Sequence, residues 1–360
     1  MSRPPKIRLK DIAAELGLSA ATVSLCLNNN QTRYQLNAET VRKVRDLAHK
    51  VGYVPDWAAR ILKQGATRCV GLLTNRHWRA GQKCLSAVFA AEQRLSAAGI
   101  ECRQLSCSDQ IEGIKQLRDL NCREIIVFDP VVDDSEYCHI TCSPEKIARQ
   151  FPGTTIYAVD YSVSGNYCSA ETTPVIRLGV KIWDFHTKLM EVMQKHFPGE
   201  IMLQAWRCSM PHIADLRKRA PELIFAMESE NPFKIGEAGA RQFLQTRKNH
   251  RITNVFWGDD RMACGFINEL MKHGVSVPDE VNVISFDNLD FSRYLAIPLT
   301  TWGVPIMHHT QLVVDSLLNK AELTDRISLP VLSAGKSARL SKEIIAELAP
   351  YCQLASDNDY

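Results

Sequence analysis

Six short apolar segments alternate with amphipathic helical patterns between residues 69 and 287 of the chain. The segments are CVGLLTN (69–75), IIVFDP (125–130), TTIYAVD (154–160), EIMLQAW (200–206), TNVFWGDD (253–260) and VNVISFD (281–287), and the helical patterns cover 82–97, 175–196, 236–248 and 261–273. Strands that alternate with helices form parallel sheets covered on both faces. The alternating segment is longer than one α/β domain usually needs. It therefore predicts two α/β units side by side.

The first 65 residues lack this alternation and carry an excess of positive charge. They hold 11 Lys or Arg and 5 Asp or Glu, whereas the whole chain has a formal net charge of only +3. A basic head on a mildly acidic body fits a module that binds a polyanion. Charge alone leaves open that the head merely presents a solvated basic face.

Residues 9–51 have the spacing of three short helices. Ile12 and Leu16 lie on the apolar side of the first helix, which Gly17 ends because glycine tolerates a left-handed backbone. Ser19 stands where the N-cap of a second helix belongs, and Asn37 stands at that position of a third. Two helices joined by a short turn predict a helix-turn-helix unit, and any other small helical bundle is the alternative.

Several motifs in a fixed order extend this prediction to nearly the whole chain. They are DIAAELGLSAATVS (11–24), LN (27–28), NAETVRKV (37–44), GYVPD (52–56), AARILKQG (58–65) before CVGLL (69–73), GDDRMACG (258–265) and VISFDNLDFSRYLAIPLTT (283–301). With these motifs the chain resembles the lactose-repressor (LacI/GalR) family of bacterial transcription regulators. The resemblance implies a small all-α helix-turn-helix head plus an α/β periplasmic-binding-protein-like core of two Rossmann-like subdomains.

The same resemblance divides the chain into four parts. These are a DNA-binding head (1–55), a hinge helix or linker (56–67), an effector-binding and dimerisation core (68–345) and a C-terminal tail (346–360). Within the core, the first subdomain takes 68–160 and 304–330 and the second takes 161–297 and 331–345, so the crossings are expected near 161, 297 and 330. The last 20 residues show no sustained heptads, so no tetramerisation coil is expected.

In this family the second helix lies in the major groove of double-stranded DNA. The resemblance implies these DNA-binding residues: Ser19, Ala20, Ala21, Thr22, Ser24, Leu25, Asn28, Arg33, Tyr53, Ala59 and Leu62. Hydroxyls suit phosphates or base edges, and Leu62 is expected to wedge into the minor groove. Leu25 stands where relatives usually carry Arg or His, so guanine readout is expected to be weaker. Paired hinge helices imply a homodimer on a pseudo-palindromic operator.

The resemblance also implies a small-molecule effector of the carbohydrate class between the subdomains, beyond the carboxyl ends of the strands. The implied effector-binding residues are Asn75, Trp78, Asp160, Arg217, Phe233, Asp259 and Asp287. A carboxylate and a guanidinium can bracket vicinal hydroxyls. Asp259 replaces the usual Asn, so two alternatives stay open: an unusual ligand, or a pocket that has lost its ligand and acts without one. Whether an effector releases or promotes DNA binding also stays open.

The sequence lacks the motifs of the rival protein classes. An enzyme on a Rossmann-like sheet needs a G-x-G-x-x-G after a strand, a P-loop or a G-x-S-x-G elbow, and the sequence has none. We therefore expect no catalytic residue, no cofactor and no metal. Cys138 and Cys142 around His139 suggest a metal or redox site, but no second ligand pair lies near them.

The N-terminus has no apolar export signal, and no apolar run is long enough to span a membrane. The 12 cysteines are therefore expected to be reduced thiols in the cytoplasm. A solute-binding protein, which needs export and has no use for a basic head, is disfavoured.

Overall fold

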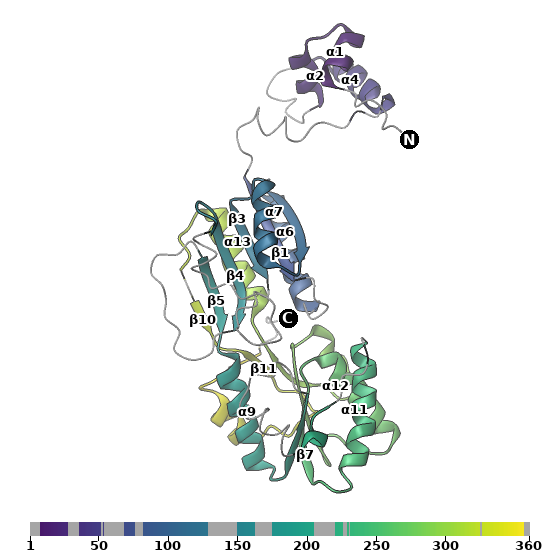
Figure 1. The fold of residues 1–360 in the computed structure, drawn as a ribbon, viewed down its shortest axis with the longest axis vertical. Helices are drawn as coiled ribbons and strands as arrows, with labels where there is room; N and C mark the ends of the chain where they lie inside the picture. The colour runs from purple at the N-terminus through teal and green to yellow at the C-terminus, as the bar shows by residue number, and fades with distance from the viewer. Residues whose placement is uncertain are drawn as a thin grey trace. The chain divides into compact units, whose positions relative to one another are not determined.

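The computed structural model describes residues 8–27, 36–51, 53, 68–75, 82–128, 150–162, 175–204, 220–225, 229, 231–324 and 326–355 (Figure 1). The chain separates into two compact units, Met1–Thr67 and Arg68–Tyr360. We call the first unit the head and the second the core, and each is described by itself. No helix in the described ranges is long and apolar enough to cross a bilayer.

The head contains α1 (Leu9–Leu16), α2 (Ala20–Leu27) and α4 (Ala38–Lys50). Gly17 ends α1 with φ +61°, as its position in the sequence predicts. The side chain of Asn37 caps α4 by accepting hydrogen bonds from the Glu39 and Thr40 N–H groups. Buried apolar side chains from all three helices pack together, with Val23 and Val44 fully buried at the centre. The three predicted helices and both predicted caps are confirmed.

The first sheet of the core has six parallel strands in the order β10-β5-β4-β3-β1-β2. The strands are β1 (Cys69–Asn75), β2 (Glu101–Cys107), β3 (Glu124–Phe128), β4 (Thr155–Ser162), β5 (Val175–Val180) and β10 (Arg326–Ser328), and the helices of this half are α6 (Gln82–Ala97), α7 (Gln110–Asp119) and α13 (Ile306–Asn319). Helix α6 packs beside α13, and α13 also contacts β4. A segment late in the sequence therefore completes the layer that the first hundred residues of the core begin (Figure 1).

The second sheet has the order β12-β11-β9-β8-β7-β6 and is parallel except where β11 runs against β9. Its strands are β6 (Glu200–Leu203), β7 (Ile252–Phe256), β8 (Asn282–Phe286), β9 (Thr300–Gly303), β11 (Val331–Ser333) and β12 (Gln353–Leu354). Its helices are α9 (Ile182–His196), α11 (Pro232–Thr246), α12 (Asp260–Lys272) and α14 (Lys342–Leu348), with short 3-10 turns η1 (Pro221–Leu223) and η2 (Asp290–Tyr294). Side chains on opposite faces of β8 enter two different apolar clusters, because successive residues of a strand point to opposite faces.

Helices α11 and α12 pack with their backbones in close contact. A Cβ atom on Gly236 would lie 2.0 Å from the carbonyl oxygen of Met262, and one on Gly265 would lie 2.2 Å from that of Phe233. Each helix therefore needs a residue without a side chain where it meets the other. This contact holds the N-terminal ends of both helices at one side of the second sheet.

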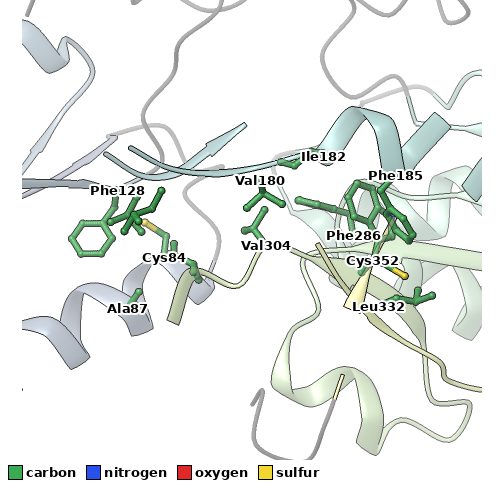
Figure 2. Close-up of a cluster of buried hydrophobic side chains, with 14 of the residues drawn as sticks. Cys84, Ala87, Phe128, Val180, Ile182, Phe185, Phe286, Val304, Leu332 and Cys352 are labelled. Atoms are coloured by element: carbon green, nitrogen blue, oxygen red, sulfur yellow. The ribbon is translucent and has the colours of Figure 1, made fainter. Parts of the chain in front are cut away.

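One apolar cluster is continuous between the two halves of the core (Figure 2). Phe128 comes from the first sheet, Phe185 and Phe286 come from the second half, and Val180 and Val304 stand where the chain passes between them. All five side chains are buried. The halves are thus joined by shared packing as well as by chain connections.

The structure corrects two of the three expected crossings between the sheets. Residues 175–180 form β5, which pairs with β4, so the chain leaves the first sheet after Val180 and not near 161. The alternation in VIRLGV is a strand pattern that the helical interpretation of 175–196 overlooked. Strand β9 belongs to the second sheet, so the return follows Gly303 and not 297. The third crossing lies between Ser328 and Val331.

The predicted tail from 346 onward is part of the core as far as residue 355. Leu348 is fully buried at the end of α14, and β12 forms the edge strand of the second sheet beside β11. Ala355 also donates its N–H to the carbonyl of Leu332. These residues were assigned to a tail because a two-residue strand is too short to show a period in the sequence.

Candidate functional site

The second helix of the head packs one face into the apolar cluster of the head and leaves the other face at least partly exposed to solvent. Its buried residues are Val23 and Cys26. The predicted DNA-facing residues lie on the other side: Ser19, Ala20 and Ala21 are exposed, and Thr22, Ser24 and Leu25 are half-buried. This partly exposed face thus carries methyl groups, hydroxyls and one leucine, which are side chains short enough to let the helix backbone approach a groove.

Ser19 sets the start of this helix. Its Oγ accepts a hydrogen bond from the Thr22 N–H at 3.0 Å and lies 2.8 Å from Thr22 Oγ1. The turn before it is held by the Leu18 N–H, which donates to the carbonyl of Ala13 at 2.9 Å. The Ser19 hydroxyl is therefore already hydrogen-bonded within the helix. We expect the residues after Ser19, rather than Ser19 itself, to contact the bases.

Of the remaining residues that were predicted to bind DNA, only Tyr53 lies among the described residues. Tyr53 is half-buried and packs against the apolar core of the head, and its N–H donates to Ala48. This packing gives Tyr53 a structural role in the head. Asn28, Arg33, Ala59 and Leu62 lie outside the described residues, and so do Cys138, His139 and Cys142.

Arg68 fixes the point at which the chain enters the core. Its Nε and Nη2 atoms each lie 2.7 Å from the Glu124 carboxylate on β3, and its Nη1 donates to the Leu317 carbonyl on α13. The bidentate geometry is the strong form of an arginine–carboxylate pair. The first residue after the linker thus contacts both a strand and the helix that returns late in the chain.

In the core, two of the predicted effector residues lie near one arginine at the carboxyl ends of β7 and β8. Asp259 caps α12 by accepting from the Arg261 N–H at 2.7 Å, and its carboxylate also contacts the Arg261 guanidinium, with Nη2–Oδ2 at 2.5 Å. Hydrogen bonds to Asp259 raise the pKa of Arg261, and Asp287 raises it further. A charged guanidinium paired with the Asp259 carboxylate is therefore present where the family resemblance implies hydroxyl-binding groups.

Asp287 is held in an unusual backbone conformation. Its φ is +107°, and its N–H donates to the Trp302 carbonyl at 2.9 Å. Phe233, in the first turn of α11, keeps 41% of its surface exposed, enough for a ring face to stack on a ligand. Asn75 and Asp160 lie at or near the carboxyl ends of β1 and β4. Trp78 and Arg217 fall outside the described ranges.

Asp260 also lies at this strand end, as the strand-end rule indicates, but the family resemblance assigned it no role. It is completely buried, and it accepts hydrogen bonds from Ser285 Oγ at 2.5 Å, Thr301 Oγ1 at 2.5 Å and the Leu289 N–H at 2.6 Å. Burial raises the pKa of its carboxyl to about 7, although these hydrogen bonds oppose the shift. The residue ties β7, β8 and β9 together beneath Asp259 and Asp287.

Two family models match the chain. The lacI family of bacterial regulatory proteins matches residues 8–56, and a periplasmic binding protein-like domain matches residues 218–336. Among curated proteins, the chain is similar to the HTH-type transcriptional repressor PurR of Vibrio parahaemolyticus, with 26% identity over 325 residues that cover 82% of this chain and 86% of that repressor. PurR of Glaesserella parasuis is 25% identical over 326 residues, covering 87% and 90%.

Solved structures agree on the fold. The lac repressor dimer bound to operator and the anti-inducer ONPF has a TM-score of 0.59 at 17% identity, covering 93% of this chain and all of that one. A LacI-family regulator from Silicibacter pomeroyi has a TM-score of 0.62 at 16% identity, covering 92% and 100%. With the two sheets and the helical head, these matches confirm the predicted fold class.

Proposed function

Because the chain belongs to the lacI family of bacterial regulatory proteins, we propose that it is a sequence-specific DNA-binding transcription regulator that acts as a repressor, and not an enzyme. The observation that carries this proposal is the partly exposed face of α2, where exposed Ala20 and Ala21 precede half-buried Thr22 and Ser24 on a separate basic unit. Alanine methyls can pack on thymine methyls, and hydroxyls can reach phosphates or base edges. Its place of action would be the cytoplasm.

Ala21→Glu is expected to weaken operator binding at least tenfold, since it puts a negative charge on the face that would meet the phosphates. Ala97→Glu, the same change at an exposed position at the end of α6 in the core, is the matched control. Genome-wide mapping of bound sites supplies the operator, and fluorescence anisotropy with that duplex measures affinity across a salt series. Equal affinity for operator and scrambled duplexes would contradict the proposal.

The assembly that we propose is a homodimer on a pseudo-palindromic site. The lac repressor structure that this chain resembles is a dimer on operator. In this chain, Leu85 and Phe89 lie one turn apart on α6 with 59% and 63% of their surfaces exposed. Two large apolar side chains on one helix face suit burial against a second copy. Sedimentation equilibrium of the free chain measures its mass directly.

The core would bind a small molecule, of the carbohydrate class, that changes operator affinity. The carboxyl ends of β7 and β8 offer the carboxylates of Asp259 and Asp287 and the guanidinium of Arg261. Phe233 offers an exposed ring. A transcriptional regulator CelR of similar fold has been solved with cellobiose. The alternative is a regulator whose pocket acts without ligand, because Asp259 is already occupied by Arg261.

Calorimetric titration of the full chain with a panel of sugars and nucleosides separates these alternatives. A bound sugar is expected to lose at least tenfold in affinity with Asp287→Asn, which removes the charge but keeps a residue type that tolerates positive φ. Lys115→Met, at an exposed site on α7, is the control. Absence of heat across the panel would favour the ligand-free regulator.

A further inference from the structure

Two cysteine thiols face each other inside the first half of the core. Cys69 is the first residue of β1, and Cys122 lies in the connection between α7 and β3. Their Sγ atoms are 3.4 Å apart. A Cβ atom on Gly71 would lie 3.4 Å from the Cys122 Cβ, so Cys122 packs against the face of β1 that also carries Cys69. We call Cys69 and Cys122 the thiol pair.

The two members of the thiol pair differ in their chemistry. The hydrogen bond between them lowers the pKa of Cys69, and the charge of Arg103 acts in the same direction, although burial opposes the shift. The same hydrogen bond, together with burial, raises the pKa of Cys122. Because the thiolate is the reactive form of cysteine, Cys69 is the sulfur that an oxidant attacks first. Cys122 then lies within reach as the second sulfur.

We propose that the thiol pair is a site of reversible oxidation by hydrogen peroxide, and that its disulfide clamps the start of β1 to the turn before β3. Peroxide converts the Cys69 thiolate to a sulfenic acid, and the Cys122 sulfur then displaces the hydroxyl group as water. In sum, two thiols and one peroxide give one disulfide and two waters. The sulfurs must approach by about 1.4 Å to reach bonding distance. A dithiol reverses the reaction by exchange.

The new bond would form beside the anchorage of the linker. Cys69 directly follows Arg68, and Cys122 precedes Glu124 by two residues. Arg68 and Glu124 form the bidentate pair that fixes the entry of the chain into the core. A disulfide here closes a long loop of chain, which constrains the unfolded state and stabilises the folded one. Oxidation therefore adds a covalent clamp to an ionic one.

Burial of the thiol pair determines which oxidant can reach it. Cys69 is 5% exposed and Cys122 is fully buried. Cys69 lies at the end of a strand, where local opening is easiest, and hydrogen peroxide is little larger than water. Oxidised glutathione, a disulfide of two tripeptides, is too large for the same path. Cys352 has the same exposed fraction as Cys69, but its Sγ donates to the Leu348 carbonyl at 3.5 Å, so it provides a control.

Peptide mapping of the full chain tests the site directly. The reduced protein is treated with hydrogen peroxide or with oxidised glutathione, remaining thiols are alkylated, and peptides are identified by mass spectrometry without reduction. The cross-link between Cys69 and Cys122 is expected to be at least tenfold more abundant than any other disulfide between described cysteines. It is expected to disappear with dithiothreitol, and to form at least tenfold less with oxidised glutathione.

Urea denaturation measures the clamp. Peroxide treatment is expected to lower the unfolding equilibrium constant of the core at least tenfold, as expected when a disulfide closes a long loop. Cys69→Ser and Cys122→Ser should each abolish this change, whereas Cys352→Ser should retain it. In Cys122→Ser the sulfenic acid of Cys69 has no second sulfur and is expected to accumulate, where dimedone labels it. In Cys69→Ser, Cys122 should stay unmodified.

Three results would overturn the proposal. One is that peroxide leaves both thiols unmodified, and another is that Cys69 is oxidised without forming a bond to Cys122. The third is that the cross-link forms but leaves the unfolding equilibrium unchanged, which would remove the clamp. Variants are compared only where circular dichroism shows the native fold, and the wild-type peptide map decides the site even if no variant folds. DNA takes no part in these measurements, so their outcome is independent of operator recognition.

Discussion

Asp260→Ala is expected to lower the free energy of unfolding of the core by about 3 kcal/mol or more. The substitution leaves the hydroxyls of Ser285 and Thr301 and the N–H of Leu289 without their acceptor inside the protein. It also leaves a cavity where three strands are tied together. Urea denaturation of the purified chain, followed by circular dichroism, measures the change.

Asp260→Asn is the matched control for this prediction. An amide keeps an oxygen for the Leu289 N–H and an NH₂ group that can donate to the hydroxyl oxygens, so its loss of stability is expected to be well under half that of Asp260→Ala. Equal losses for the two variants would show that the hydrogen bonds contribute little. The same pair of variants can be compared in ligand and operator binding, because Asp260 lies beneath the predicted effector residues.

The pH dependence of stability gives a second test of Asp260. Burial raises the pKa of its carboxyl from 3.8 to about 7, so the folded chain binds a proton that the unfolded chain releases. The contribution of this group to stability is therefore full below pH 4 and falls as the pH rises towards 7. The wild type is expected to lose up to about 4 kcal/mol relative to Asp260→Asn across this window. A constant difference would show that Asp260 stays ionised.

Gly236→Ala is expected to destabilise the second half of the core by about 3 kcal/mol, or to prevent its folding, because overpacking here meets backbone. The added Cβ would lie 2.0 Å from the Met262 carbonyl oxygen and 2.7 Å from the Phe266 nitrogen, and neither atom can move without shifting α12. Since Asp259 caps α12, any shift would also displace the predicted effector residues. Thermal and urea unfolding measure the effect.

Gly113→Ala is the control for Gly236→Ala, because it is also a glycine-to-alanine change within a helix. Its Cβ would meet the Leu73 Cδ1 atom at 2.7 Å, which is the far end of a flexible side chain. The gain in helix propensity offsets part of this contact, so a change within about 1 kcal/mol is expected. If both variants lose the same stability, backbone contact between α11 and α12 is not the cause.

The sequence predicted helices and strands well where a segment has a long periodic pattern. The pattern over 82–97 has the bounds of α6, and the caps at Ser19 and Asn37 act as predicted. The prediction was wrong over 175–180, because this six-residue strand runs almost directly into α9 and its short alternation was included in the longer helical pattern that follows. A local pattern also cannot tell which sheet a strand joins, since that choice depends on pairing partners distant in sequence.

For the candidate site, too, the sequence predicted some residues and could not predict others. The rule that polar residues gather beyond strand ends indicated Asp259 and Asp287, and both lie there beside Arg261. The rule could not distinguish Asp259 from Asp260, because the two are adjacent and differ only in which direction their side chains take. The interaction of Asp259 with Arg261, two residues away at a helix N-terminus, was likewise invisible to motif comparison.

Arg68 gives the core a mechanical connection to the linker. One guanidinium joins β3 to α13, so any sliding of α13 against the first sheet must move or break the anchorage of the residue at which the linker ends. In the proposed dimer, the Arg68 of each copy would therefore follow any shift of α13 against the first sheet.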